Sequence, residues 1–475
     1  MRTYLLNPTI KGQAPHIREG RCMQKASSWA TAWPPLTLAV LGAIAREWGP
    51  VRLLDGNVDP LTLHDLLREI AEFNADLVVV NTGFPSIDND MTVVSAVKQA
   101  RPGATVAAFG VFFTLLEQRG FADYPALDAA LVGEPEATFR EWGAALAAGR
   151  TDWSAIAGMI YRNAGGEAVQ TPARPLIGDL DSLPRPDRSL LQNDRYRLPH
   201  NNRPFTLVNT ARGCPYTCTY CIVNAYYGRG SRRRSIPSIM GEVRDCVETH
   251  GIREFLFWEE VFTLDREYVL AFCRALMESG LKIRWAATTR LDRVSPELLA
   301  VMKQAGCYLL GLGIESGDQG VLDAARKNQS VDLAPRVVAM CRQAGIRTMG
   351  HFIFGLPGET RETAEATIRF MTGLGLDYMQ CYAAVPYPGT ELGQLASEKG
   401  WITATRWSQY DFGGASVLRT DTLSPGEVDW FRARAFRRFY FRPLYLLRRL
   451  LADASLRQLL RLSVFLEWMR LGRRR

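Results

Sequence analysis

Two patterns of apolar and polar positions alternate along the first 150 residues. Short apolar runs alternate with stretches whose apolar residues recur at helical spacing, which is typical of strands and helices that follow one another. This alternation predicts a parallel, doubly wound sheet with helices on both faces. Strands are expected at residues 3–6, 51–54, 77–81, 105–109 and 129–132. Helices are expected near 36–47, 61–73, 90–100, 115–120 and 136–148.

Small and polar residues gather where the expected strands of this first domain end. In parallel sheets ligands bind at the carboxyl ends of the strands, so these residues are candidate ligand contacts. Composition alone identifies no ligand, and a Rossmann-like domain that binds nothing remains an alternative. The residues are Asp55, Thr82, Gly83, Gly110, Gly133 and Glu134.

The segment from residue 151 to about 200 shows neither the strand-like nor the helical pattern, and its prolines and polar residues are typical of an extended linker. After it, a strand pattern followed by a helical pattern recurs six times. These strands are expected near residues 205–211, 253–258, 283–288, 308–314, 347–354 and 378–385. The predicted organisation is a first α/β domain at 1–150, a linker at 151–200, a second α/β domain at 201–400 and a basic helical region at 401–475.

Three cysteines stand close together where the first strand of the second domain ends. Cys214, Cys218 and Cys221 lie in the stretch RGCPYTCTYC, which Gly213 and Pro215 help to turn. Three thiolates at these spacings can converge on one metal centre. Iron–sulfur clusters normally take four cysteine ligands, so three would leave one iron open to a ligand that is not protein.

Other interpretations of this loop remain. A zinc site would need a fourth Cys or His at ligand spacing, and His200 and His250 do not form such a pair. The C-x-x-C of Cys218 and Cys221 is also typical of a thioredoxin-like redox pair, which leaves Cys214 without a role. Structural cysteines in a core are the third alternative, although they rarely fall at this spacing.

The spacing Cys-x3-Cys-x2-Cys after a strand resembles that of radical S-adenosylmethionine (SAM) enzymes. The resemblance implies a partial (β/α)6 barrel of the TIM type. It also implies a 4Fe-4S cluster held by Cys214, Cys218 and Cys221, whose open iron binds the amino and carboxylate groups of SAM. Tyr220, between two of the cysteines, would flank the bound SAM.

Further landmarks of that family fall at the ends of later strands. The resemblance implies that an acidic pair after the second strand holds the amino group of SAM. The glycine-rich end of the fourth strand would face its ribose, and the turn after the fifth strand its adenine. An arginine that ends the third strand can pair with a carboxylate through its fork of donors. An exposed acidic turn, a surface arginine and a plain strand-to-helix turn are the alternatives. The implied SAM contacts are Tyr220, Glu259, Glu260, Arg290, Gly311, Gly313, Glu315, Ser316 and Gly355.

The first domain is similar to the cobalamin-binding domain that precedes the barrel in one subgroup of these enzymes. The similarity comprises an early Asn7-Pro8, a Trp-Pro-Pro-Leu helix start at 33–36, Asp55 after the second strand and Gly133-Glu134-x-Glu136 after the last strand. It implies that cobalamin binds at the strand-end residues of this domain.

Composition is that of an ordinary globular protein, with 47% hydrophobic and 22% charged residues. Nine scattered cysteines fit a reducing compartment, and neither a signal peptide nor an apolar run long enough to span a membrane is apparent. The net charge of +8 resides in the tail, where Arg432 to Arg475 holds 13 Arg and two acidic residues. We expect a cytoplasmic protein whose basic tail packs on its body or contacts the inner face of a membrane. Nothing resembles a nucleic-acid reader.

These features favour an enzyme that uses a 4Fe-4S cluster, SAM and cobalamin to methylate an unactivated carbon of a small or lipophilic substrate. Electrons would come from a donor such as flavodoxin or ferredoxin. The same architecture occurs in a cobalamin-dependent ring cyclase, so cyclisation or carbon-skeleton rearrangement is an alternative. A non-catalytic module that only carries the cluster or cobalamin is the third. The sequence assigns no catalytic acid or base.

Overall fold

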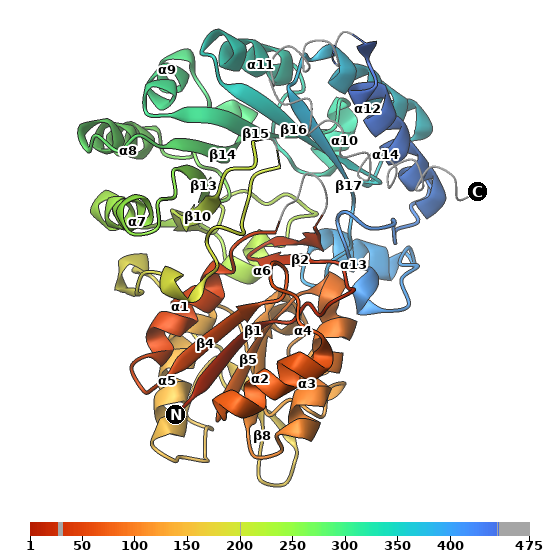
Figure 1. Ribbon diagram of the computed structural model, residues 1–475. Coiled ribbons are helices and arrows are strands. Elements are labelled where there is room, and N and C mark those ends of the chain that lie inside the picture. Colours follow the sequence, from red (N-terminus) through yellow and green to blue (C-terminus); the bar gives the residue numbers. More distant parts are fainter. Residues whose placement is uncertain (27–31, 200, 444, 446–475) are drawn as a thin grey trace.

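A computed structural model describes residues 1–26, 32–199, 201–443 and 445 of the chain. Figure 1 shows two α/β bodies that lie against each other, one coloured red to orange and the other green to blue. Each body has its own sheet with helices packed around it. The expected fold class is confirmed: a Rossmann-like domain, a six-stranded barrel-type domain and a helical C-terminal part.

The first sheet has the strand order β4-β1-β5-β6-β7-β8-β9. Its first five members are parallel, and the last two pair antiparallel. Two helices cover one face and three cover the other, which makes the sheet doubly wound. The strands are β1 (Thr3–Asn7), β4 (Val51–Asp55), β5 (Leu77–Thr82), β6 (Thr105–Gly110), β7 (Ala129–Leu131), β8 (Met159–Arg162) and β9 (Ala168–Gln170). The helices are α1 (Leu36–Ala45) and α5 (Pro135–Ala147) on one face, and α2 (Leu63–Phe73), α3 (Ile87–Ala100) and α4 (Val111–Ala122) on the other.

The central strands of this sheet are apolar throughout because helices cover both of their faces. Every residue of β5 is buried. Val78 and Val80 contact the side of α2, α3 and α4, whereas Val79 contacts the side of α1 and α5. In the amphipathic α2, by contrast, only Leu66 and Ile70 are buried. The period-2 and period-3.6 patterns of the sequence therefore correspond to these two environments.

Two features of the first body do not follow from its sequence pattern. Strands β8 and β9 extend the sheet to Gln170, within the segment expected to be a linker, while the domain bounds themselves remain predictions. Between β1 and α1, a hairpin of β2 (His16–Glu19) and β3 (Cys22–Lys25) stands at the junction of the two bodies (Figure 1). The buried Arg18 fastens this hairpin to the first body through a 2.8 Å ion pair with Asp90 of α3 and a hydrogen bond to Asn7 at the end of β1.

The second sheet has the order β10-β13-β14-β15-β16-β17, and all its neighbours are parallel. The helices that connect successive strands lie along its outside (Figure 1), as in barrels of strand–helix repeats. The strands are β10 (Phe205–Asn209), β13 (Glu254–Trp258), β14 (Arg284–Arg290), β15 (Cys307–Glu315), β16 (Arg347–Phe354) and β17 (Tyr378–Ala383). The helices are α7 (Ile236–Glu248), α8 (Arg266–Glu278), α9 (Pro296–Gln304), α10 (Gln319–Ala324), α11 (Leu333–Gln343) and α12 (Arg361–Gly373).

Side chains of these strands alternate between the outer helices and the barrel interior. On β15, Leu310 and Leu312 are buried in the large core that the helices cover, whereas Leu309 and Gly311 line the interior. Leu309 is only partly buried although it lies within a strand. The outer layer of the second body is therefore fully packed, and its interior is not.

Smaller elements complete the second body. Strand β11 (Ala211–Arg212) pairs antiparallel with β12 (Arg232–Arg233), and α6 (Val223–Tyr227) lies between them in the chain. After α13 (Glu391–Glu398), helix α14 (Pro425–Tyr440) packs on β17 and α12. The hydroxyl of Tyr440 donates to the carbonyl of Met379 (2.7 Å) and accepts from its N–H (3.0 Å). The predicted basic tail from residue 446 onward lies outside the described residues. No helix in the described ranges combines the length and apolar character needed to cross a membrane.

A buried network of opposite charges joins the two bodies. Arg212 of β11 forms ion pairs with Glu134 (3.1 Å) and Glu136 (2.5 Å) at the start of α5, and Arg232 of β12 pairs with Glu134 (2.8 Å). The two carboxylates also lie where the helix dipole favours negative charge. Their side chains are only 2% and 1% exposed, so breaking a pair would leave a charge unpaired away from water.

Replacing Glu136 by Ala is expected to lower the free energy of unfolding by about 3 kcal/mol, because Arg212 stays buried with half of its compensation removed. Urea denaturation measures this loss. The matched control is Glu141→Ala on the same helix, where the carboxylate is 47% exposed and pairs with Arg174 at the surface. We expect less than about 1 kcal/mol for the control, and equal losses in both variants would contradict the role given to the buried network.

Candidate active site

The three predicted cluster cysteines lie in the loop between β11 and α6. Gly213 has φ +90°, and a Cβ there would come within 2.3 Å of the carbonyl oxygen of Gly230, so the turn requires glycine. Further along the loop, the N–H of Thr219 donates to the carbonyl of Ala325 (3.1 Å), and the N–H of Leu392 donates to the carbonyl of Thr219 (2.9 Å). These backbone contacts tie the loop to the ends of α10 and α13.

Cys214, Cys218 and Cys221 all line one cavity. Burial raises the pKa of Cys221 to about 12 and also raises the pKa of Cys214, and the nearby carboxylate of Glu260 adds to both shifts. Within the part of the chain that the structure describes, no three His, Cys, Asp or Glu side chains are already arranged to hold a metal ion. Cysteine ligands lose their protons when a metal binds, so iron would have to draw these thiols together.

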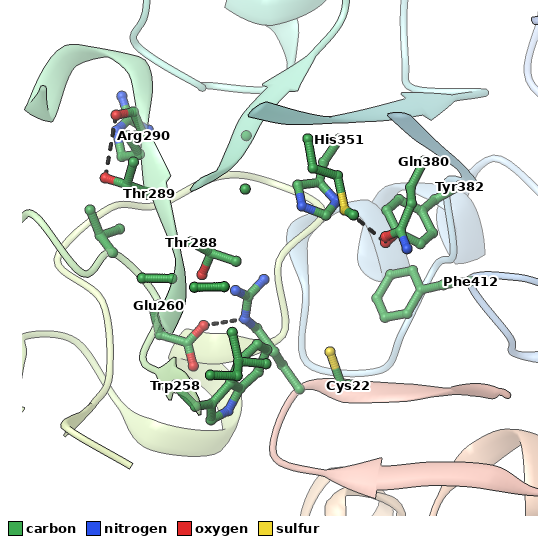
Figure 2. Close-up of a pocket in the computed structure, with 18 of the residues that line it drawn as sticks. Cys22, Trp258, Glu260, Thr288, Thr289, Arg290, His351, Gln380, Tyr382 and Phe412 are labelled. Atoms are coloured by element: carbon green, nitrogen blue, oxygen red, sulfur yellow. Dashed lines mark hydrogen bonds and ion pairs between the residues drawn. The ribbon is translucent and has the colours of Figure 1, made fainter. Parts of the chain in front are cut away.

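The cavity has a volume of about 340 Å³ and lies at the carboxyl ends of the barrel strands, where chemistry gathers in such folds. Figure 2 shows Glu260 and Trp258 on one side of it, and His351, Gln380 and Tyr382 on the other. The structure brings together six of the nine residues predicted to contact SAM. The six that line the cavity are Tyr220, Glu260, Arg290, Gly311, Gly313 and Glu315.

The acidic pair after β13 is divided between two environments. Glu260 lines the cavity. Glu259 lies outside it, where it accepts a hydrogen bond from Thr210 (2.6 Å) and pairs with Arg233 (3.1 Å). Burial raises the pKa of Glu259 to about 7, although Arg233 opposes this shift. Of the two carboxylates, Glu260 is therefore the one that can meet a ligand in the cavity.

Two cationic side chains of the barrel, Arg290 and Lys327, line the cavity mouth, and they differ in how fully nearby groups satisfy their charge and their donors. Arg290 pairs with Asp292 (2.9 Å) and stacks on the ring of Tyr216 at 3.8 Å, yet its buried Nη1 has no hydrogen-bond partner among the described residues. Lys327 pairs with Glu315 (2.7 Å). An unsatisfied buried donor is costly, so Arg290 is poised to bind an anionic group in the cavity.

The backbone around Glu315 and Lys327 takes unusual conformations. Glu315, at the end of β15, has φ +67°, and Arg326 and Asn328 on either side of Lys327 both have φ +48°. Such conformations cost energy in residues other than glycine and tend to persist at functional sites. They place the carboxylate of Glu315 and the ammonium of Lys327 in the cavity wall.

Ser316, Gly355 and their neighbours support the site from outside the cavity lining. Ser316 is fully buried, and its hydroxyl lies 3.1 Å from that of Thr367. Gly355 has φ +86°, and its N–H donates to the carboxylate of Glu359 (2.5 Å). Glu359 is itself fully buried and thus shapes the turn after β16.

The sequence pattern missed the contribution of the first body to this cavity. Arg21 and Cys22, at the end of the β2–β3 hairpin, reach into the lining. Arg21 forms an ion pair with Glu260 and lies 5.0 Å from the ring centre of Trp258. Figure 2 shows Cys22 below Tyr382 and Phe412. No periodic or spacing signal marks a hairpin tip, so only the folded structure reveals these residues.

Comparison with known proteins places this geometry in a family. The family model of the radical SAM superfamily matches residues 208–371, and that of the B12 binding domain matches residues 26–142. A protein of Pyrococcus horikoshii described as an uncharacterized methyltransferase is 31% identical, with 88% of this chain and 90% of that protein covered. The chain belongs to the B12-binding radical SAM family.

Two further comparisons show which characterised enzymes this chain resembles. The anaerobic magnesium-protoporphyrin IX monomethyl ester cyclase of Rubrivivax gelatinosus is 26% identical, with 87% of this chain and 75% of the cyclase covered. The solved structure of OxsB, a cobalamin-dependent S-adenosylmethionine radical enzyme, superimposes with a TM-score of 0.74 at 16% identity, covering 99% of this chain and 71% of OxsB. The radical SAM fold with a B12-binding domain is thereby confirmed. The protein is an enzyme whose family uses a 4Fe-4S cluster, SAM and cobalamin.

The carboxylates predicted to bind cobalamin in this radical SAM protein are engaged by other residues. Asp55 is buried and accepts hydrogen bonds from Asn7 (2.8 Å) and Tyr196 (2.9 Å). Glu134 belongs to the charge network that joins the two bodies. Neither carboxylate lines the cavity. Both therefore stabilise the docked arrangement of the bodies, and their contact with cobalamin remains a prediction.

The remaining predicted cobalamin residues also lie outside the cavity lining. Thr82 donates to the carbonyl of Phe109 (2.8 Å), and a Cβ on Gly110 would come within 2.1 Å of the Thr82 carbonyl, so these two residues serve strand packing. Gly83 lies against the hairpin, because a Cβ there would meet Met23 at 3.5 Å. A Cβ on Gly133, by contrast, would meet nothing within 4 Å. The first body lines the cavity instead with Arg21, Cys22, Gln24 and Trp33.

Glu359 gives this radical SAM protein a testable pH dependence. Burial raises its pKa from 4.5 to about 8. Between pH 5 and pH 8 the unfolded chain has lost this proton while the folded protein keeps it, so stability falls as pH rises, by up to about 1.4 kcal/mol per pH unit. We expect Glu359→Gln, which stays neutral, to reduce the slope measured in urea denaturation by this amount, while other buried carboxyl groups with a raised pKa, such as Glu259, keep the remainder. The exposed Glu362→Gln should leave it unchanged, and a slope equal in all three proteins would contradict this account.

Proposed function

We propose that this enzyme transfers a methyl group to an unactivated carbon of a small molecule held in the barrel cavity. This proposal rests on a cavity that three groups of residues share. The three loop cysteines, the charged residues predicted to contact SAM and side chains of the first body all line it. The Pyrococcus relative described as a methyltransferase supports the same reaction. When bound, the cluster supplies the electron that splits SAM, and cobalamin supplies the methyl group.

The residues of the chain then have separate tasks. Cys214, Cys218 and Cys221 would hold the cluster. Glu260, which lines the cavity, would hold the amino group of SAM, and the unpaired Nη1 of Arg290 would receive an anionic group. Gly311, Gly313, Glu315 and Tyr220 would complete the SAM site, with Gly311, Gly313 and Glu315 toward the ribose and Tyr220 near the cluster cysteines. Ser316, Glu259 and Gly355 act from behind the cavity wall, through the contacts that hold these residues in place.

Binding of SAM requires a rearrangement at Glu260. The guanidinium of Arg21 occupies this carboxylate in the structure. An ammonium group that binds Glu260 therefore shares it with Arg21 or displaces it, and the released guanidinium remains near the ring of Trp258. Binding of SAM is thereby coupled to the hairpin of the first body.

In this proposal Gln24 and Trp33 of the first body would hold cobalamin between the two bodies. An indole face suits the apolar corrin ring, and an amide suits the amide groups at the corrin edge. Contact of cobalamin with Gly83, Gly110 and Gly133 remains a prediction, and Gly83 itself packs against Met23 of the hairpin. A small electron-transfer protein such as flavodoxin or ferredoxin supplies electrons. Contact of the basic tail with a membrane remains a prediction.

Ring closure or carbon-skeleton rearrangement is the second candidate, because the Rubrivivax relative is a cyclase. The products of SAM distinguish the two reactions. A methyltransferase that regenerates its methyl donor from SAM forms S-adenosylhomocysteine besides 5′-deoxyadenosine, whereas a cyclase forms only 5′-deoxyadenosine. We expect the reduced, cluster-loaded enzyme to form both products with cobalamin and only 5′-deoxyadenosine without it. Formation of 5′-deoxyadenosine alone under both conditions would favour the cyclase, and formation of neither a non-catalytic module.

Replacing Cys218 by Ala is expected to abolish both products, with at least a 100-fold loss, because a cluster held by two thiolates loses iron. Iron content and the visible absorbance of the cluster, measured together with product formation, check this. The matched control is Cys273→Ala, since Cys273 is a buried thiol of α8 in the large core. Loss of the cluster in the control, or its retention in Cys218→Ala, would contradict the assignment.

A further inference from the structure

The barrel interior is hollow where barrels of strand–helix repeats are usually filled. In (β/α)8 barrels, bulky branched side chains pack the interior in layers. Here inward positions carry Ala286 on β14 and Gly311 and Gly313 on β15, which occupy little space. Leu309 and Met349 line the same interior and are only partly buried, although both lie within strands. The cavity beside the cysteine loop therefore continues into the barrel.

The hollow runs along most of the length of the barrel. Its lining includes Glu315 at the carboxyl end of β15 and Tyr308 near the amino end of the same strand. They are seven positions apart, which corresponds to roughly 23 Å at the usual rise of a strand. Phe205 and Tyr378, the first residues of β10 and β17, line the same inner end. The cavity is thus long.

Charged and apolar surfaces are separated along this length. The inner half presents hydrocarbon and the rings of two tyrosines. The hydroxyl of Tyr378 accepts a hydrogen bond from Arg347 (3.1 Å), and the ring of Tyr308 packs 4.5 Å from the guanidinium of Arg284. The charged lining residues of the described chain all lie at the mouth: Arg21, Glu260, Arg290, Glu315 and Lys327. The inner half is lined by Phe205, Leu256, Ala286, Tyr308, Leu309, Met349 and Tyr378. An apolar group gains most by burial in the inner half.

The hollow is small for its length, since about 340 Å³ extends over roughly 23 Å. The strand register places Ala286 between Leu256 and Leu309 on one wall. Nearer the mouth, a Cβ on Gly311 would come within 2.9 Å of His351 Nε2 and 3.0 Å of Thr288 Cγ2, so side chains of the neighbouring strands already cover part of this glycine. A slender, flexible group fits such a space, and a broad fused ring system does not.

We propose that the substrate carries an extended hydrocarbon chain, which lies in the inner half of the barrel while the carbon to be modified stands at the charged mouth. The position of the reacting carbon rests on the proposed methyl transfer, whereas binding of the chain does not. Acyl chains and isoprenoid chains are both extended hydrocarbon chains of this kind. Each methylene that leaves water strengthens binding about fourfold, so a long apolar hollow selects by chain length.

The first experiment measures binding to the full-length, cluster-loaded enzyme. The fluorescent polyene parinaric acid serves as the probe, and linear fatty alcohols of increasing length, geranylgeraniol and cholesterol compete with it. We expect affinity to rise about fourfold per methylene and then to level off when the chain reaches the inner end. Preference for the linear alcohols identifies an acyl chain, and preference for geranylgeraniol an isoprenoid chain. Affinity independent of length, or competition by cholesterol equal to that of the best alcohol, would overturn the proposal.

Two variants test the location of the chain in opposite directions. Ala286→Leu adds bulk to the inner half and is expected to weaken binding of the longest alcohols about tenfold. Leu309→Ala removes bulk there and should shift the preference to longer chains. Ala144→Leu, at an exposed position of α5 in the first body, is the size-matched control. If both inner variants bind the alcohol series as the control does, the chain does not lie there and the proposal fails.

The SAM-product measurement keeps this inference separable from the proposed function. Chain-length selection that responds to Ala286→Leu and Leu309→Ala supports the inference even where no S-adenosylhomocysteine forms. Formation of S-adenosylhomocysteine without any binding of linear chains leaves methyl transfer standing and removes the extended chain. If Ala286→Leu does not retain the absorbance of the cluster, the test rests on Leu309→Ala, because that variant adds no bulk. A shift of its preference to longer alcohols then supports the proposal, and no shift contradicts it.

Discussion

The pairing of Arg212 and Arg232 with Glu134 and Glu136 is the constraint on which the rest of the arrangement depends. These charges lie away from water, so each is tolerable only while its partner on the other body is in place. Arg212 also stands two residues before Cys214, on the short strand from which the cysteine loop departs. The ion pairs that dock the two bodies therefore also fix the strand from which the cluster ligands project.

A second constraint is the alternation of side chains along the barrel strands. Outward positions such as Leu310 and Leu312 form the packed layer under the helices, and this layer can hold the sheet together without help from the interior. The inward positions are thereby free to remain small or polar. The glycines of β15 and Ala286 use this freedom, and the strained backbone at Glu315 shows where stability is given up at the mouth.

Much of the fold could be predicted because period and spacing are local properties. Apolar runs located the strands of both sheets, and the spacing of three cysteines located the loop at the barrel mouth. The choice between Glu259 and Glu260 could not be made, since neighbouring residues at a strand end point in opposite directions and only the register decides. Arg21 and Lys327 were missed because a hairpin tip and an irregular turn carry no periodic signal.

The contact between Arg21 and Glu260 has a consequence for how such proteins can evolve. One body supplies a guanidinium to the catalytic face of the other, so the barrel module is incomplete when it is separated from its N-terminal companion. Recombination that exchanges one module between relatives would have to preserve the hairpin together with the acidic strand end it meets. We therefore expect the hairpin and the acidic strand end to vary together among relatives, more tightly than either sheet does.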